Sequence, residues 1–221
     1  QMIDKVDRIL HQRSVDLTII AQSKIVEDFF SGQKITHQDL SGFVRKFGLL
    51  SGPWDVLYFL DADGKIEHSS VAQQDAHTAS LNKLPLSKEA FSAALRGEIY
   101  YSDAVFSDYS KKPTIIIAVP IRQEDNVMQP ISGVVIGHIS WQMITSALQE
   151  LPMEAKIFNA NGKIIASNRA DARFTDEVDI DDIGLIQSGA SGWYIDEEDG
   201  RSLLEVGVME RVAGLLQHPR Q

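Results

Sequence analysis

The sequence has 221 residues and a mass of 24.6 kDa, which is enough for one large or two small domains. Hydrophobic residues make up 43% of the chain and charged residues 24%, and this composition excludes collagen, low-complexity disorder and a coiled-coil rod. The formal net charge of −10 disfavours binding to nucleic acid and to anionic lipid surfaces. The absence of cysteine excludes disulfides, thiolate metal sites and cysteine nucleophiles.

The first predicted element is a long amphipathic helix. Over residues 2–31, apolar side chains recur at intervals of three and four, the period of a helix with one apolar face. Gly32 is predicted to end this helix, and a second, shorter helix is predicted over residues 38–47. We expect two copies of the long helix to pair in parallel through its apolar seam, which includes Val6 and Leu10.

Downstream of the helices, the pattern changes to short runs rich in β-branched and aromatic residues. Five such runs are separated by turn-forming residues, and a capped helix is predicted between the second run and the third. The predicted strands cover residues 56–60, 65–69, 99–102, 114–121 and 131–140, and the predicted helix covers residues 87–96. This order predicts an antiparallel sheet with helical connections, an α+β fold.

An internal repeat divides the chain. Residues 60–66 (LDADGKI) recur as residues 158–164 (FNANGKI), and residues 101–103 (YSD) recur in the same order as residues 194–196 (YID). Two ordered matches predict two modules of one design in tandem, in which the two glycine turns close equivalent hairpins. The second copy has no counterpart of the long strand over 131–140, so we expect that module to be incomplete in this sequence.

Several short motifs stand in a fixed order along the chain. They are residues 59–66 (FLDADGKI), 94–97 (ALRG), 101–103 (YSD), 112–115 (KPTI), 118–121 (AVPI) and 133–135 (GVV). Together with the long N-terminal helix, they resemble the double Cache family of extracytoplasmic ligand-sensing regions. Members belong to bacterial and archaeal chemoreceptors, sensor histidine kinases and diguanylate cyclases. The resemblance covers nearly the whole chain and implies a long N-terminal helix that carries two PAS-like antiparallel-sheet modules in tandem.

The resemblance also implies a domain order and a function. Residues 1–52 would form a helical stalk, residues 53–148 the membrane-distal module and residues 149–221 the membrane-proximal module. The chain is expected to bind a small molecule in the distal module, to catalyse nothing and to need no cofactor. It would lie outside the cytoplasm in a membrane-anchored homodimer whose output domain signals inside the cell. Two alternatives stay open: a structural or dimerisation ectodomain with a vestigial pocket, and a cytoplasmic PAS-type sensor with haem or flavin.

Amino-acid-binding members of the family share a recognition pattern, and this sequence keeps part of it. Tyr101 and Asp103 match a Tyr-x-Asp motif, and Phe91 matches an aromatic position upstream. Lys88 stands where the pattern has arginine, and His138 stands where it has a later aspartate. The resemblance therefore implies a ligand site that contains Lys88, Phe91, Tyr101, Asp103, His138 and Ser140.

Two of these replacements change the ligand that we expect. Without the arginine and the later aspartate, an α-amino acid loses the partners of its carboxylate and its ammonium group. With histidine in place of the aspartate, the site has one negative charge fewer and one hydrogen-bond donor more. With Lys88 nearby as well, we expect an organic anion or a neutral polar ligand to bind in preference to an amine. Asp103 argues the other way, and a bond between Asp103 and His138 would satisfy both without a ligand.

The remaining chemical motifs favour neither an enzyme nor a metal site. Residues 61–64 (DADG) lack the further acidic positions of a calcium loop and predict a hairpin turn, while residues 196–200 (DEEDG) predict a solvated turn. The six histidines lack zinc-site spacing, and no nucleophile elbow, phosphate-binding loop or dinucleotide fingerprint is found. We therefore expect no catalytic residue and no bound metal.

Overall fold

The computed structural model describes residues 2–52, 54–71, 85–102, 104–107, 110, 112–122, 130–140, 142–150, 156–158, 164–168, 192–198 and 201–207. The chain divides into two compact units, which we call the sheet unit and the hairpin unit. The sheet unit is Leu10–Ser110 with Thr114–Ser140, and the hairpin unit is Gln1–Ile9 with Lys111–Pro113 and Trp141–Gln221. The domain boundaries expected after residues 52 and 148 stay a prediction.

The sheet unit contains a six-stranded sheet of order β2-β1-β6-β5-β3, in which β4 also pairs with β5. Its strands are β1 (Trp54–Asp61), β2 (Ile66–Ser69), β3 (Tyr100–Tyr101), β4 (Val105–Phe106), β5 (Pro113–Arg122) and β6 (Ile131–Ser140). The β1–β2, β1–β6, β5–β6 and β3–β5 pairs are antiparallel, and the predicted α+β class is confirmed. The bounds of β6 are those expected from the sequence, whereas β4 is too short for alternation to predict it.

Four helices among the described residues accompany the sheet. They are α1 (Met2–Ala21), α2 (Lys24–Phe30), α3 (His37–Leu50) and α5 (Pro85–Leu95). The expectation of one helix over residues 2–31 is wrong, because the chain breaks between α1 and α2. Ser23 has extended backbone (φ −71°, ψ 139°), and its hydroxyl donates to the carbonyl of Ile20 at 2.7 Å. This hydroxyl gives a carbonyl near the end of α1 a partner outside the helical ladder, so α1 can end there.

The beginning of α3 is fixed by a capping box. The hydroxyl oxygen of Thr36 accepts from the backbone N–H of Asp39 at 3.1 Å, and the carboxylate of Asp39 accepts from the N–H of Thr36 at 3.0 Å. The bonds from the side chain and then the backbone of Thr36 lower the pKa of Asp39. They start α3 at His37, so the helix is longer at both ends than the expected 38–47.

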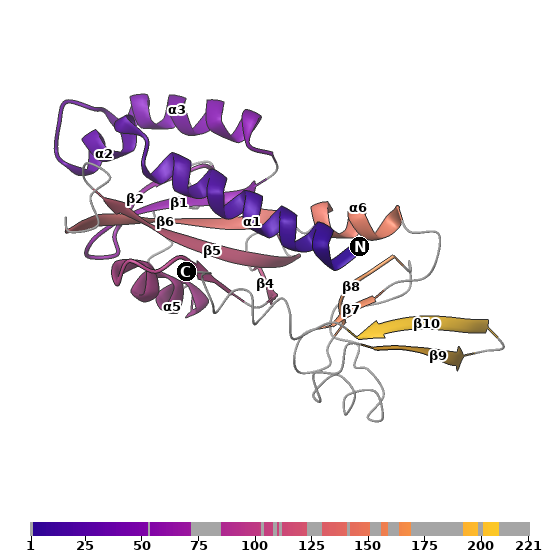
Figure 1. Ribbon diagram of the computed structural model, residues 1–221. Helices are drawn as coiled ribbons and strands as arrows, with labels where there is room; N and C mark the ends of the chain where they lie inside the picture. The colour runs from indigo at the N-terminus through magenta and orange to yellow at the C-terminus, as the bar shows by residue number, and fades with distance from the viewer. Residues whose placement is uncertain are drawn as a thin grey trace. The chain divides into compact units, whose positions relative to one another are not determined.

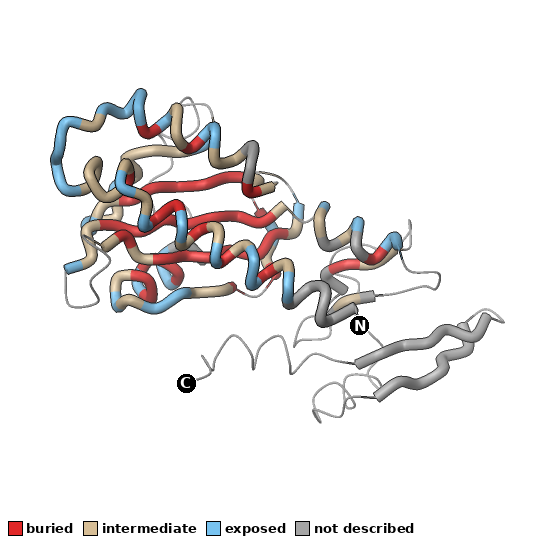
Figure 2. The backbone as a smooth tube through the Cα atoms, turned by 45° about the horizontal axis from the view of Figure 1, so that its top comes forward, coloured by how far each residue is buried: buried red, intermediate tan, exposed pale blue. Residues whose placement is uncertain are grey.

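The long strands are buried along most of their length, which requires cover on both faces of the sheet. Residues 56–60 of β1, 114–119 of β5 and 133–139 of β6 are all buried. Figure 1 shows α1, α2 and α3 on one face of the sheet and α5 on the other. In Figure 2 the buried residues lie along the strands and on the sides of the helices that face them. Side chains on both faces of the strands therefore belong to the core.

The hairpin unit contains two antiparallel hairpins and the helix α6 (Gln142–Gln149). They pair β7 (Lys156–Phe158) with β8 (Ile164–Ser167) and β9 (Gly192–Glu198) with β10 (Arg201–Gly207). The β7–β8 register repeats that of β1–β2: Phe158↔Ile164, Ile157↔Ala166 and Lys156↔Ser167 match Leu60↔Ile66, Phe59↔His68 and Tyr58↔Ser69. Both hairpins shift register at the same step, so the first part of the predicted repeat is confirmed. The turn at residues 159–163 lies outside the described residues.

None of the helices described in the structure is both long enough and apolar enough to cross a membrane.

Candidate functional site

His138 lies on β6, the strand between β1 and β5. It is opposite Val56 of β1 and Ile116 of β5, so these three side chains share one face of the sheet. This is the face that α5 covers, and we call it the α5 face. Its buried apolar residues are Val56, Tyr58, Leu60, Ala90, Phe91, Ala94, Ile116, Ala118, Val134 and Ile136. The side chain of His138 is only 4% exposed, so an imidazole is embedded in an otherwise apolar layer.

The imidazole of His138 has no hydrogen-bond partner at either nitrogen among the described residues. Its ring contacts that of Tyr58 edge-on, with ring centroids 5.7 Å apart and planes at 75°. Burial lowers the pKa of His138 to about 4, so the ring is neutral at pH 7 and offers one donor and one acceptor. An unpaired buried polar group is costly, and such groups gather at functional sites.

The lowered pKa predicts a pH-dependent stability. In the unfolded chain His138 titrates near 6.5, so protons bind the unfolded state first as the pH falls. The folded chain keeps the ring neutral, so its stability is highest above pH 6.5 and falls between pH 6.5 and pH 4. Over that range the loss should be about 3 kcal/mol. Urea unfolding of the native chain and of His138→Leu at pH 7.5 and pH 4 checks this, because other titrations cancel in the difference; equal pH dependence would contradict it.

Two further predicted site residues lie on α5. Phe91 is 8% exposed and belongs to the apolar cluster of the α5 face. Lys88 lies three residues earlier along the helix and is exposed. The structure thus brings Phe91 to the same face as His138 and leaves the ammonium group of Lys88 at the surface. Ser140, two residues after His138 on β6, points to the same side by strand alternation and is half-buried.

The register of β3 distinguishes its two tyrosines. Tyr100 is opposite Ala118, whose side chain lies on the α5 face, and Tyr100 packs against the apolar cluster there. Tyr101 is opposite Ile117, which points to the other face, so the structure does not bring Tyr101 together with His138. Tyr58 and Tyr100 are the aromatic residues that sequence reasoning missed on this face. Asp103 lies outside the described residues.

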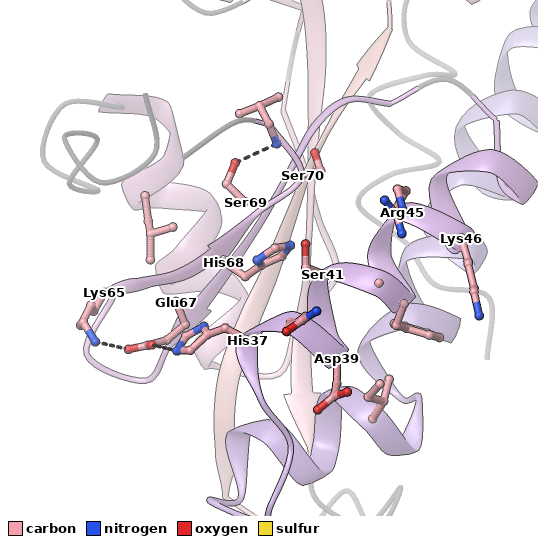
Figure 3. Close-up of a pocket in the computed structure, with 16 residues that line it drawn as sticks. His37, Asp39, Ser41, Arg45, Lys46, Lys65, Glu67, His68, Ser69 and Ser70 are labelled. Carbon is pink, nitrogen blue, oxygen red and sulfur yellow. Dashed lines mark hydrogen bonds and ion pairs between the residues drawn. The ribbon is translucent and has the colours of Figure 1, made fainter. Parts of the chain in front are cut away.

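A polar groove lies between α3 and β2, and no motif in the sequence pointed to it. Its volume is about 1370 Å³, and a neighbouring hollow of about 400 Å³ shares several of its residues. The residues common to both are Ser41, Arg45, His68, Ser69, Ser70 and Val71. Figure 3 shows the groove, which we call the α3–β2 groove. His68 is opposite Phe59, a neighbour of Tyr58 in β1, so it points to the face opposite His138.

The described residues contain no cluster of three or more histidine and acidic side chains that could hold a metal ion.

No protein-family model matches the chain, and no curated protein matches it in sequence. Solved structures do match its fold. The ligand-binding domain of Pseudomonas fluorescens chemoreceptor CtaA, in complex with L-isoleucine, aligns with a TM-score of 0.58 at 17% identity, over 91% of this chain and 78% of that one. The ligand-binding domain of Pseudomonas aeruginosa PAO1 amino acid chemoreceptor PctC, in complex with GABA, aligns with a TM-score of 0.61 at 13% identity, over 91% and 84%.

The extracellular domain of the proposed histidine kinase rpHK1S-Z16 aligns with a TM-score of 0.63 at 13% identity, over 90% of this chain and 80% of that one. The chain has the fold of receptor sensor domains. This confirms the α+β sensor-domain fold that the double Cache resemblance implies, and the tandem arrangement of two modules is confirmed only in part. Two of these three structures, those of CtaA and PctC, are ligand-binding domains of chemoreceptors.

Proposed function

We propose that this chain is the extracytoplasmic ligand-sensing domain of a transmembrane receptor, and that a small molecule binds on the α5 face beside His138. The observation that carries the proposal is the buried imidazole, whose two nitrogens have no partner among the described residues. Ligand-binding domains of the same fold support the sensor role. A ligand that hydrogen-bonds to His138 would remove the cost of the unpaired group.

We propose an organic anion or a neutral polar molecule as the ligand class. L-isoleucine and GABA, the ligands of the CtaA and PctC domains, each carry a carboxylate and an ammonium group. In this chain the neutral imidazole of His138 is a buried polar side chain of the α5 face that has no hydrogen-bond partner among the described residues. A neutral imidazole gives an ammonium ion no compensating charge, whereas its N–H can donate to a carboxylate or carbonyl oxygen. Asp103 is the one site residue whose charge would favour an amine.

We also propose that the chain forms a homodimer in the full-length receptor, through the outward side of α1. The seam expected to mediate this contact is turned inward, because Leu10 is 3% exposed and Leu17 is fully buried. Val15 and Ile19 are instead exposed at 37% and 57%, and they lie one helical turn apart. Movement of the two paired helices would carry the ligand signal towards the output domain.

Cysteine cross-linking tests the proposed pairing, since this sequence has no cysteine of its own. In the full-length receptor in membranes, Ile19→Cys should give disulfide-linked dimers under mild oxidation, because a symmetric helix pair brings the two copies together. Lys46→Cys, exposed on α3, is the control and should stay monomeric. Dimers from Lys46→Cys alone would contradict the proposal.

A thermal-shift screen of organic acids, sugars, amino acids and amines tests the proposed function on the purified chain. A sensor domain gains stability with its ligand by mass action, by about 2.7 kcal/mol at a ligand concentration of 100 times the Kd. A structural ectodomain with a vestigial pocket should respond to no compound. A haem or flavin sensor would show visible absorption as purified, which would contradict the proposal at once.

A further inference from the structure

The α3–β2 groove carries hydroxyl donors that have no acceptor among the described residues of the protein. The hydroxyl oxygen of Ser70 accepts from the backbone N–H of Leu57 at 2.8 Å. A hydroxyl that accepts in this way keeps its own hydrogen free to donate. Ser69 is opposite Tyr58 in β1, so its side chain points to the α5 face and is not among the donors of the groove. Within the described residues Ser70 donates to no protein atom, and Ser41 on the opposite wall has no hydrogen-bond partner. The groove is therefore rich in donors.

The charges of the groove are also unbalanced towards the positive. Arg45, which lines both the groove and the adjoining hollow, forms no ion pair within the described part of the chain. The carboxylate of Asp39 is held by Thr36, and that of Glu67 by Lys65 and, at 4.0 Å, by His37. Asp55 lines only the smaller hollow. Although the whole protein has a net charge of −10, this groove presents a guanidinium group with no carboxylate partner.

His68 gives the floor of the groove a titratable donor. Its ring packs against Phe59 with ring centroids 5.8 Å apart, and Figure 3 shows it reaching into the groove from β2 as Ser41 does from α3. Burial, and then the nearby His37, lower the pKa of His68. A bound anion beside the ring would oppose both effects and raise that pKa.

We propose that the α3–β2 groove is a second ligand site, which takes a small oxyanion, a carboxylate or a phosphate. Arg45 would supply the charge and a planar pair of donors, and the hydroxyls of Ser41 and Ser70 would fill remaining acceptor positions of the anion. The site lies on the sheet face opposite His138, so it is independent of the site proposed there. A receptor with both sites could respond to two compounds.

Titration calorimetry with inorganic phosphate and with citrate, at pH 7 and constant ionic strength, tests the proposal on the purified chain. Arg45→Gln should weaken the binding of the favoured probe by about tenfold or more, because it removes a charged hydrogen-bonding group. Lys34→Gln is the matched control: it removes one positive charge from an exposed position just before α3, and Lys34 lines neither the groove nor the adjoining hollow. It should change the affinity by less than about twofold.

The outcomes separate cleanly. The proposal is supported if phosphate, citrate or both bind the native chain and only Arg45→Gln weakens that binding. Which of the two probes binds then shows whether the groove prefers a phosphate or a carboxylate. Binding that also raises the pKa of His68, followed by NMR, places the anion in the groove. No binding of either probe, or equal losses in Arg45→Gln and Lys34→Gln, overturns the proposal. Neither result bears on ligand binding at His138, because that site lies on the other face.

Discussion

Replacing His138 by leucine is expected to stabilise the ligand-free chain by about 1–3 kcal/mol at pH 7 and to abolish ligand binding on the α5 face. The imidazole is 4% exposed and lacks a hydrogen-bond partner among the described residues, so the folded chain bears its desolvation cost without compensation. Leucine has a similar size and suits the surrounding apolar layer. A gain in stability with a loss of binding is the result expected of a residue kept for recognition.

Thr114→Val is the matched control for that experiment. Thr114 is fully buried, like His138, but its hydroxyl donates to the carbonyl of Ile139 at 2.9 Å. Removing this satisfied bond should destabilise the chain by about 1 kcal/mol. Urea unfolding of both variants gives the comparison. If His138→Leu destabilises as much as Thr114→Val, His138 has a partner within the folded chain, and the bond to Asp103 becomes the better explanation.

Gly133→Ala is expected to destabilise the chain by about 3 kcal/mol or more. A Cβ atom at Gly133 would lie 2.4 Å from the backbone oxygen of Leu60 and 3.1 Å from the ring of Phe30. Backbone cannot move aside as a flexible side chain can, so β6 would be pushed from β1 or α2 from the sheet. This glycine thus allows the close packing that holds the strand of His138 in place.

Gly42→Ala provides the opposite case on α3. A Cβ atom there would meet nothing within 4 Å, and alanine is the better helix former by about 0.5–1 kcal/mol. Thermal or urea unfolding should therefore show a small gain for Gly42→Ala and a large loss for Gly133→Ala. Similar effects from both substitutions would contradict the packing described for β6 and α2.

The parts of the fold that local patterns determine could be predicted from the sequence. The bounds of β6 follow from a run of β-branched residues between turn-forming segments, and the β7–β8 hairpin follows from the repeat of residues 60–66. The helical run ends near Gly32 because a residue with positive φ often follows the end of a helix, and glycine adopts that conformation easily. The φ of Gly32 is +73°. Each of these features depends on residues close together in the chain.

Features that depend on tertiary pairing could not be predicted in this way. The break at Ser23 depends on the hydrogen bond from its hydroxyl to the carbonyl of Ile20. The spacing of apolar residues continues across the break, so that spacing could not reveal it. The face of Tyr100 and Tyr101 depends on the register with β5, because two residues cannot show which of them points inward. The α3–β2 groove joins side chains from two elements that share no motif. His138 could be singled out only by resemblance, since its burial and missing partners are properties of the fold.

The most direct test of the central claim is an NMR spectrum of the histidine rings, recorded at pH 7 with and without a compound that stabilises the chain in the thermal-shift screen. We expect a large change in the signals of His138, because the ligand bonds to its ring, and none in those of His11, which is exposed on α1. A stabilising compound that leaves the His138 signals unmoved would contradict the claim that the ligand binds on the α5 face.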